Sequence, residues 1–183
     1  MTHTIVFTGH VIDKSARPKP RFPARIEESV TEQIKLKLLE QKESNPGAEI
    51  KGISAAACGG DIIFHEQCAA IGIETELYLA LPRDEFKKWS VAYAGEEWVH
   101  RFDNLLKKRP VHFLKKPETG DKVWAQANTW MLEEAARQSP ENVTLMALWN
   151  GEGGDGPGGT EHMIAMAREA GAQIVIIDIT KIQ

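Results

Sequence analysis

The feature that most constrains the fold is a buried strand that runs directly into a glycine-rich turn and then a helix. Residues 143–149, Val-Thr-Leu-Met-Ala-Leu-Trp, have the length and apolar content of a buried strand. Six glycines lie between residues 151 and 159, more than a plain turn requires, and a helix is predicted over 161–170. Glycine lets backbone N–H groups approach a ligand closely, and unpaired N–H groups at a helix start favour an anion. The turn ending in Gly158, Gly159 and Thr160 therefore predicts a phosphate-binding site.

The same alternation of strand and helix runs through most of the chain. Short apolar runs predict strands at 4–8, 50–57, 75–81 and 174–179, and spaced apolar residues predict helices over 24–44, 61–72 and 121–138. Such alternation implies right-handed crossovers and a mostly parallel sheet covered on both faces. We therefore expect an α/β fold: one three-layer Rossmann-like domain over residues 1–183, its mostly parallel sheet flanked by helices. Residues 83–120 are less regular, with a possible strand at 111–114, and are expected to form a lid or an insertion.

Composition narrows the class of protein. The formal net charge of −4 gives no basic footprint, so we expect no duplex nucleic acid as partner. The two cysteines, Cys58 and Cys68, are too few for a disulfide framework and indicate a reducing compartment. Because the chain begins without a signal peptide and holds no apolar run of about eighteen residues, we expect a cytoplasmic protein with no membrane partner. His65 and Cys68 share a helix face but do not make a metal site, so we expect neither a metal nor a cofactor.

The candidate ligand residues follow the strands, because the carboxyl ends of parallel strands meet at one edge of the sheet. Most have a purely structural alternative: His10 can bond the backbone, Gly59 and Gly60 can form a tight turn, and Thr160 can cap its own helix. The two aspartates can bind ribose hydroxyls or only turn N–H groups, and the arginine can bind a second phosphate or lie on the surface. The candidates are Thr8, Gly9, His10, Arg21, Gly59, Gly60, Asp61, Asn150, Asp155, Gly158, Gly159 and Thr160.

Three motifs carry a resemblance to a known family: Thr8-Gly9, the segment 54–61 and the segment 156–160. Neither the G-x-G-x-x-G nor the Walker G-x-x-x-x-G-K-[ST] pattern occurs in the right context. The three motifs resemble the SLOG superfamily, which joins the LOG-type phosphoribohydrolases with DprA/Smf proteins. The resemblance implies a Rossmann-like nucleotide site. LOG-type enzymes cleave an N-glycosidic bond with a glutamate three residues after the threonine, where this chain has Met163, and the loop before Thr160 is also shorter than the family's.

Two functions follow from these residues. The absent glutamate favours a sensor-like protein that binds a small nucleotide-type ligand, with a possible homodimer. The alternative is an N-ribosyl hydrolase or transferase that acts on a nucleoside phosphate through another carboxylate, for which the candidates are Glu66 and Glu161. Trp89 follows the third strand, and its ring can close over a base as a lid.

Overall fold

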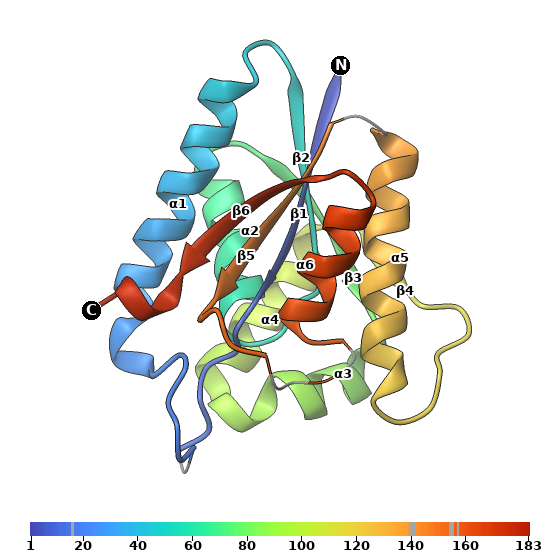
Figure 1. Cartoon of the computed structure of the whole chain (residues 1–183). Coiled ribbons are helices and arrows are strands. Elements are labelled where there is room, and N and C mark those ends of the chain that lie inside the picture. The colour runs from blue at the N-terminus through green and yellow to red at the C-terminus, as the bar shows by residue number, and fades with distance from the viewer. Residues whose placement is uncertain (16, 140–141, 154–155, 157) are drawn as a thin grey trace.

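The computed structural model describes residues 1–15, 17–139, 142–153, 156 and 158–183. Its centre is an open, six-stranded, all-parallel sheet with strand order β4-β3-β2-β1-β5-β6 (Figure 1). The strands are β1 (Thr2–Gly9), β2 (Glu49–Ser54), β3 (Glu74–Leu79), β4 (Val111–Phe113), β5 (Val143–Trp149) and β6 (Gln173–Asp178). The α-helices are α1 (Glu27–Ser44), α2 (Gly60–Ala70), α3 (Arg83–Ser90), α4 (Glu96–Lys108), α5 (Lys122–Gln138) and α6 (Thr160–Glu169). Short 3-10 helices are η1 (Ala24–Ile26), η2 (Ala92–Ala94) and η3 (Ile179–Lys181).

The helices cover the two faces of this sheet in separate layers. Successive residues of a strand point to opposite faces, and β1 follows this rule: Ile5 and Phe7 pack with α1, α2 and α4, whereas Val6 packs with α5 and α6. Because both faces are buried, β5 is nearly continuous in apolar residues, and β1 contains the unbroken apolar run Ile5-Val6-Phe7. The predicted three-layer, Rossmann-like α/β class is confirmed.

The strand order contains one change of direction. The chain builds outward from β1 through β2 and β3 to β4, and then returns through α5 to the other side of β1 for β5 and β6. Such a topological switch point is where open α/β sheets leave a crevice beyond their carboxyl ends. Gly9 pairs with Leu148 there, so the segments that follow β1 and β5 leave the sheet side by side.

Residues 83–120 are more regular than their sequence indicates. They contain α3, η2, α4 and β4, and β4 extends the sheet beyond β3. Phe86, Trp98, Phe102 and Leu105 of this segment are buried in the main core. Their spacing is helical, but the many charges between them hide it in a scan for apolar runs.

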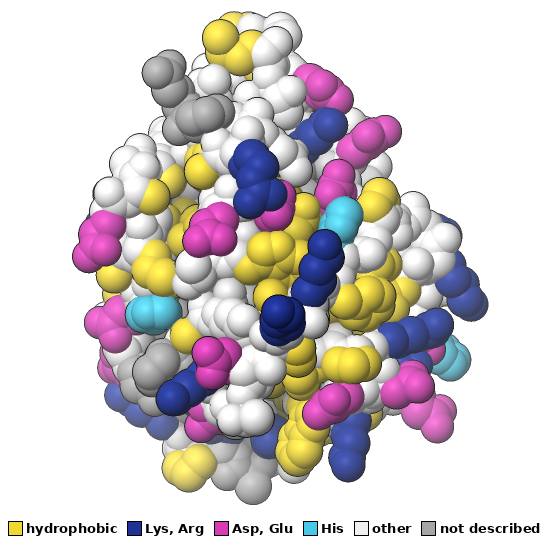
Figure 2. All heavy atoms as spheres, turned by 90° about the vertical axis from the view of Figure 1, so that its right-hand side faces the viewer, with side chains coloured by type: hydrophobic (Ala, Val, Ile, Leu, Met, Phe, Trp, Pro, Cys, Tyr) yellow, Lys and Arg dark blue, Asp and Glu magenta, His cyan; other side chains and the backbone are white. Residues whose placement is uncertain are grey.

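The outer surface mixes both signs of charge. Figure 2 shows the side covered by α5 and α6, where acidic and basic side chains stand among the visible hydrophobic ones. Within the part of the chain that the structure describes, no helix is long and apolar enough to cross a membrane.

Candidate ligand-binding site

A cavity of about 480 Å³ opens at the carboxyl ends of the strands, at the switch point of the sheet. It gathers predicted residues from three separate segments, which lie far apart in the sequence. Those that line it are Thr8, Gly9, His10, Arg21, Asp61, Gly158, Gly159 and Thr160. Gly59, Gly60 and Asn150 do not line it, and Asp155 lies outside the described residues.

One wall of the cavity is the start of α6. The first intrahelical bond of this helix is donated by Met163 N–H to Gly159 O (3.2 Å), so the N–H groups of Thr160, Glu161 and His162 precede the ladder. Gly158 has φ +98°, and a Cβ there would lie 2.6 Å from Cβ of Trp124 on α5. Asn128 Nδ2 also donates to Gly158 O at 2.9 Å. The turn is therefore held against α5, with Gly158, Gly159 and Thr160 in the cavity lining. The N–H groups of Gly158 and Gly159 donate to His162 Nδ1 and Gly156 O, so the N–H group of Thr160 is the donor left for a ligand among these three.

Thr160 is the polar side chain of this wall. The residue is only 7% exposed, and it lines the cavity. Within the described part of the chain its hydroxyl has no hydrogen-bond partner, and the helix start has no side-chain cap. The alternative role of capping its own helix is thus not realised, and the hydroxyl is reached from the cavity.

The second glycine turn, before α2, is closed by the chain itself. Gly60 N–H donates to His10 O (3.1 Å), and Ile12 N–H donates to Cys58 O (3.0 Å). A Cβ on Gly59, which has φ +118°, would lie 2.8 Å from the backbone of Val11, and one on Gly60 would lie 3.0 Å from the Phe7 ring. Gly59 and Gly60 therefore serve the close packing that was the structural alternative for them.

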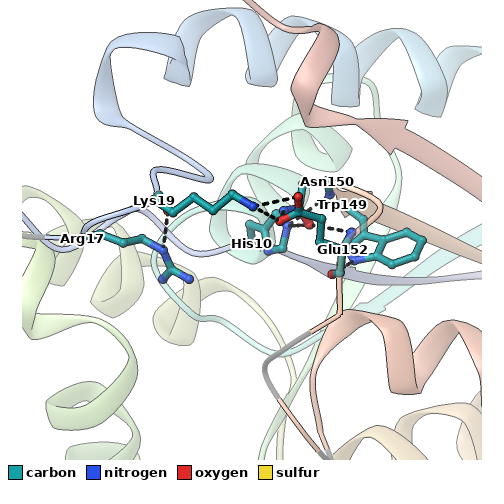
Figure 3. Close-up of polar contacts among 6 residues, drawn as sticks. All are labelled: His10, Arg17, Lys19, Trp149, Asn150 and Glu152. Carbon is teal, nitrogen blue, oxygen red and sulfur yellow. Dashed lines mark hydrogen bonds and ion pairs between the residues drawn. The ribbon is translucent and has the colours of Figure 1, made fainter.

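His10 and Asn150 join the segments that follow β1 and β5. The His10 ring is buried, and its Nε2 lies 3.0 Å from Asn150 Oδ1 and 3.2 Å from Asn150 N (Figure 3). Asn150 Oδ1 also accepts from Glu152 N–H (3.2 Å). Lys19 reaches across from the loop after β1 and donates to both carboxylate oxygens of Glu152, at 2.8 and 2.9 Å. Asn150 thus braces the loops rather than lining the cavity.

The loop between β1 and η1 forms a basic wall. Lys14, Arg17 and Arg21 all line the cavity. The base of the loop is fixed by Asp13, whose Oδ2 accepts from the N–H groups of Arg21 and Phe22, each at 2.9 Å. Phe22 is fully buried and anchors the end of the loop. Arg21 was predicted from the Pro-rich segment, whereas Lys14 and Arg17 were not among the candidates, although they share that segment.

Asp61 is a buried carboxyl group at the floor of the cavity. It is 8% exposed, and its Oδ2 accepts from Ala57 N–H at 3.2 Å. Burial raises the pKa of Asp61 to about 7, against the Ala57 N–H and the Ser54 side chain, which favour the carboxylate. Strongly shifted carboxyl groups in cavities are typical of functional sites, but they also occur in purely structural settings.

Aromatic rings surround the opposite part of the cavity. Trp89, at the end of α3, is 61% exposed and lines it together with Tyr93, Phe86 and Trp124. Lys88 Nζ lies 5.4 Å from the centre of the Trp89 ring, and Lys14 Nζ lies 4.9 Å from that of Tyr93. The sequence indicated Trp89 but not Tyr93 or Asn128, since the position of these two residues at the cavity depends on how α3 and α5 pack.

The two candidate glutamates lie away from the cavity lining. Glu66, on α2, is engaged by Arg101 of α4 through Oε1–Nε (2.9 Å) and Oε2–Nη2 (2.7 Å). Glu161 is exposed and lies against Gly153. Met163, where the LOG-type enzymes carry their glutamate, is fully buried in the core beneath α6. In residues 1–15, 17–139, 142–153, 156 and 158–183, no group of three or more His, Cys, Asp or Glu side chains could hold a metal ion.

The fold and the cavity together define a Rossmann-like α/β protein with its cavity at the topological switch point. No family model matches the sequence, and neither does any curated protein. Among solved structures, the chain is similar to DNA processing protein A (DprA) from Streptococcus pneumoniae, with a TM-score of 0.36 and 13% identity. That alignment covers 99% of this chain and 62% of the DprA chain, so this chain spans less than two thirds of its length.

Proposed function

We propose that this protein binds a nucleotide or a nucleotide derivative in the cavity at the switch point. The observation that carries the proposal is that one cavity holds both the uncapped start of α6, with the unpartnered Thr160 hydroxyl, and the basic wall of Lys14, Arg17 and Arg21. Helix N-termini and guanidinium groups are the protein groups that bind phosphate best.

The remaining lining residues suit the other parts of a nucleotide. A phosphate on the α6 N-terminus leaves Asp61 as a partner for ribose hydroxyls, as acidic residues are in dinucleotide sites. Trp89 and Tyr93 offer ring faces on which a base can stack, and such stacking is worth about 1–3 kcal/mol. The cavity volume of about 480 Å³ lies within the usual range for small-molecule sites.

Isothermal titration with a panel of nucleoside phosphates, ADP-ribose and cyclic nucleotides tests the proposal. At least one member is expected to bind, and Thr160→Val is expected to weaken it about fivefold or more, since the hydroxyl is lost without a change of shape. The matched control is Thr129→Val, because Thr129 is exposed on α5 and does not line the cavity. A short DNA duplex in the same panel tests the expectation that duplex nucleic acid does not bind. Absence of binding by every nucleotide would refute the proposal.

A second candidate function, N-ribosyl hydrolysis or transfer, is favoured by Asp61, a carboxyl group in the cavity with its pKa near neutrality. In hydrolysis the C1′–N bond breaks with its electron pair on the base, Asp61 supplies the proton, and water adds to C1′ and returns a proton to the carboxylate. Chromatographic detection of free base from a nucleoside monophosphate tests this candidate. Loss of release in Asp61→Asn alone, and not in Glu66→Gln or Glu161→Gln, is the expected pattern; no release from any substrate excludes it.

A further inference from the structure

We propose that the ligand carries at least two phosphoryl groups, as a nucleoside diphosphate or a derivative of one does, with one group on the α6 N-terminus and the next on the basic wall. This inference rests on the proposed function and narrows its ligand class. It follows from the placement of the two anion-binding walls in one cavity and from the charge that each one carries.

The α6 wall has donors but no full positive charge. The lining residues that α5, α6 and the turns before them contribute are Asp121, Trp124, Ala127, Asn128, Met131, Gly158, Gly159 and Thr160. None of these is a lysine or an arginine. A phosphate here is held by backbone N–H groups, the Thr160 hydroxyl and the helix dipole, which together suit a single phosphoryl group.

The lysine and arginine side chains of the cavity lining come instead from the loop after β1. Arg17 Nε donates to Lys19 O at 3.1 Å and lies 3.5 Å from Asp13 Oδ1, and the charge of Arg21 acts on Glu152, which is already paired with Lys19. Lys14 and Arg21 add two more positive charges. Figure 3 shows the Arg17 guanidinium pointing away from the pair formed by Lys19 and Glu152. This wall therefore has the charge to hold an anion of its own.

The two walls are close enough for one ligand. The basic loop follows β1 and the α6 turn follows β5, and β1 and β5 are hydrogen-bonded neighbours up to the pair Gly9 and Leu148. Both walls line the same cavity of about 480 Å³, so one ligand can contact both. Asp13 accepts hydrogen bonds from the backbone N–H groups of Arg21 and Phe22, so the backbone that carries Arg21 is held before the ligand arrives. A monophosphate on α6 leaves this second wall unused.

The test is titration of the full chain with AMP and ADP, and with GMP and GDP, under one buffer condition. The diphosphate of the preferred base is expected to bind about tenfold or more tightly than its monophosphate, since charged hydrogen bonds are worth about 1.5–3 kcal/mol. Arg21→Gln should remove most of the preference for the diphosphate, whereas Thr160→Val should lower the affinity for both ligands by the same factor. Lys19→Gln is the matched control, because Lys19 belongs to the same loop but pairs with Glu152 and does not line the cavity.

The outcomes separate this inference from the proposed function. A monophosphate that binds as tightly as the diphosphate overturns the inference and leaves nucleotide binding standing. An equal loss of both ligands in Arg21→Gln, with the far-ultraviolet circular dichroism spectrum unchanged, also overturns it. If neither these four nucleotides nor any member of the wider panel binds, the proposed function fails and the inference with it.

Discussion

Asp61→Asn is expected to stabilise the unliganded protein at pH 8. The wild-type carboxyl is buried at the floor of the cavity, where burial raises its pKa to about 7 from an ordinary value of 3.8. Asparagine has nearly the same shape and can still accept the hydrogen bond that Ala57 N–H donates at 3.2 Å. The substitution therefore removes the titration of the group while keeping its packing.

The sign of the effect follows from proton linkage. A pKa that is higher in the folded state means that the folded protein binds more protons than the unfolded chain between pH 3.8 and about 7. The free energy of unfolding therefore falls as pH rises through this window, and the loss is complete above it. A shift of roughly three units corresponds to about 4 kcal/mol. The altered hydrogen bond costs about 1 kcal/mol of this gain. The free energy of unfolding of the variant should therefore exceed that of the wild type by about 3 kcal/mol at pH 8.

The pH dependence of stability in the wild type alone will not reveal the contribution of Asp61, because His65 contributes with the opposite sign. Burial lowers the pKa of His65 to about 4 from 6.5, although its bond to Ala55 O favours the charged form. The unfolded chain then binds more protons between pH 4 and 6.5, so His65 makes stability rise with pH over much of the same range. The difference between variant and wild type cancels this contribution and isolates Asp61.

Urea unfolding followed by tryptophan fluorescence from pH 4.5 to 8.5 measures that difference. The stability gained by the variant should grow across this range and level off above pH 7. Asp103→Asn is a control of opposite sign: burial raises the pKa of Asp103, but hydrogen bonds from Lys87 and Arg83 outweigh it and hold the pKa low, so this variant should lose stability at neutral pH. A difference in the free energy of unfolding between Asp61→Asn and wild type that does not vary with pH would show that Asp61 does not titrate with a raised pKa in the folded protein.

Three further substitutions test other parts of the structure. Gly158→Ala should lower the free energy of unfolding by about 1–3 kcal/mol, because φ is +98° and the new Cβ would lie 2.6 Å from Cβ of Trp124; urea unfolding measures this, and an unchanged midpoint would contradict it. Trp89→Ala should change stability by less than about 0.5 kcal/mol, since the ring is 61% exposed. Titration should show that it weakens nucleotide binding about fivefold or more, and equal affinities would exclude base stacking. Arg101→Met should cost about 2 kcal/mol in the same unfolding assay, because two partly buried carboxylates lose their partner; a cost near zero would show that the ion pairs contribute nothing.

Much of the layered fold could be predicted from the sequence, because strands buried on both faces have a strong local signature. The strand predicted at 143–149 coincides with β5, and the helix predicted over 24–44 corresponds to η1 and α1. The helices of residues 83–108 could not be recognised in the same way. They are strongly charged, and the core positions Phe86 and Phe102 can be identified only from packing between distant elements.

The candidate site was predictable where residues follow strands, and less so where helices supply the walls. Thr8, Asp61 and Thr160 meet in one cavity because parallel strands end at the same edge. Gly59 and Gly60 have the same glycine-rich pattern as the turn before α6, but they are packed against the chain after β1. Whether such a turn binds a ligand or packs against the protein depends on tertiary contacts, which the local sequence does not reveal. Asn128 approaches the turn before α6 only because α5 carries the chain back across the sheet.

Two polar groups of the cavity are available to a ligand. Asp61 holds a carboxyl group where burial opposes its charge, and the Thr160 hydroxyl, which is reached from the cavity, has no partner in the described chain. Residues that break the rules of stable packing are expected mainly at functional sites, since elsewhere a better-packed residue would replace them at no loss. Both groups lie in the cavity where the basic wall and the α6 N-terminus also meet. A ligand that hydrogen-bonds to both groups would gain affinity from each of them, so the Asp61→Asn variant should gain stability and lose affinity together.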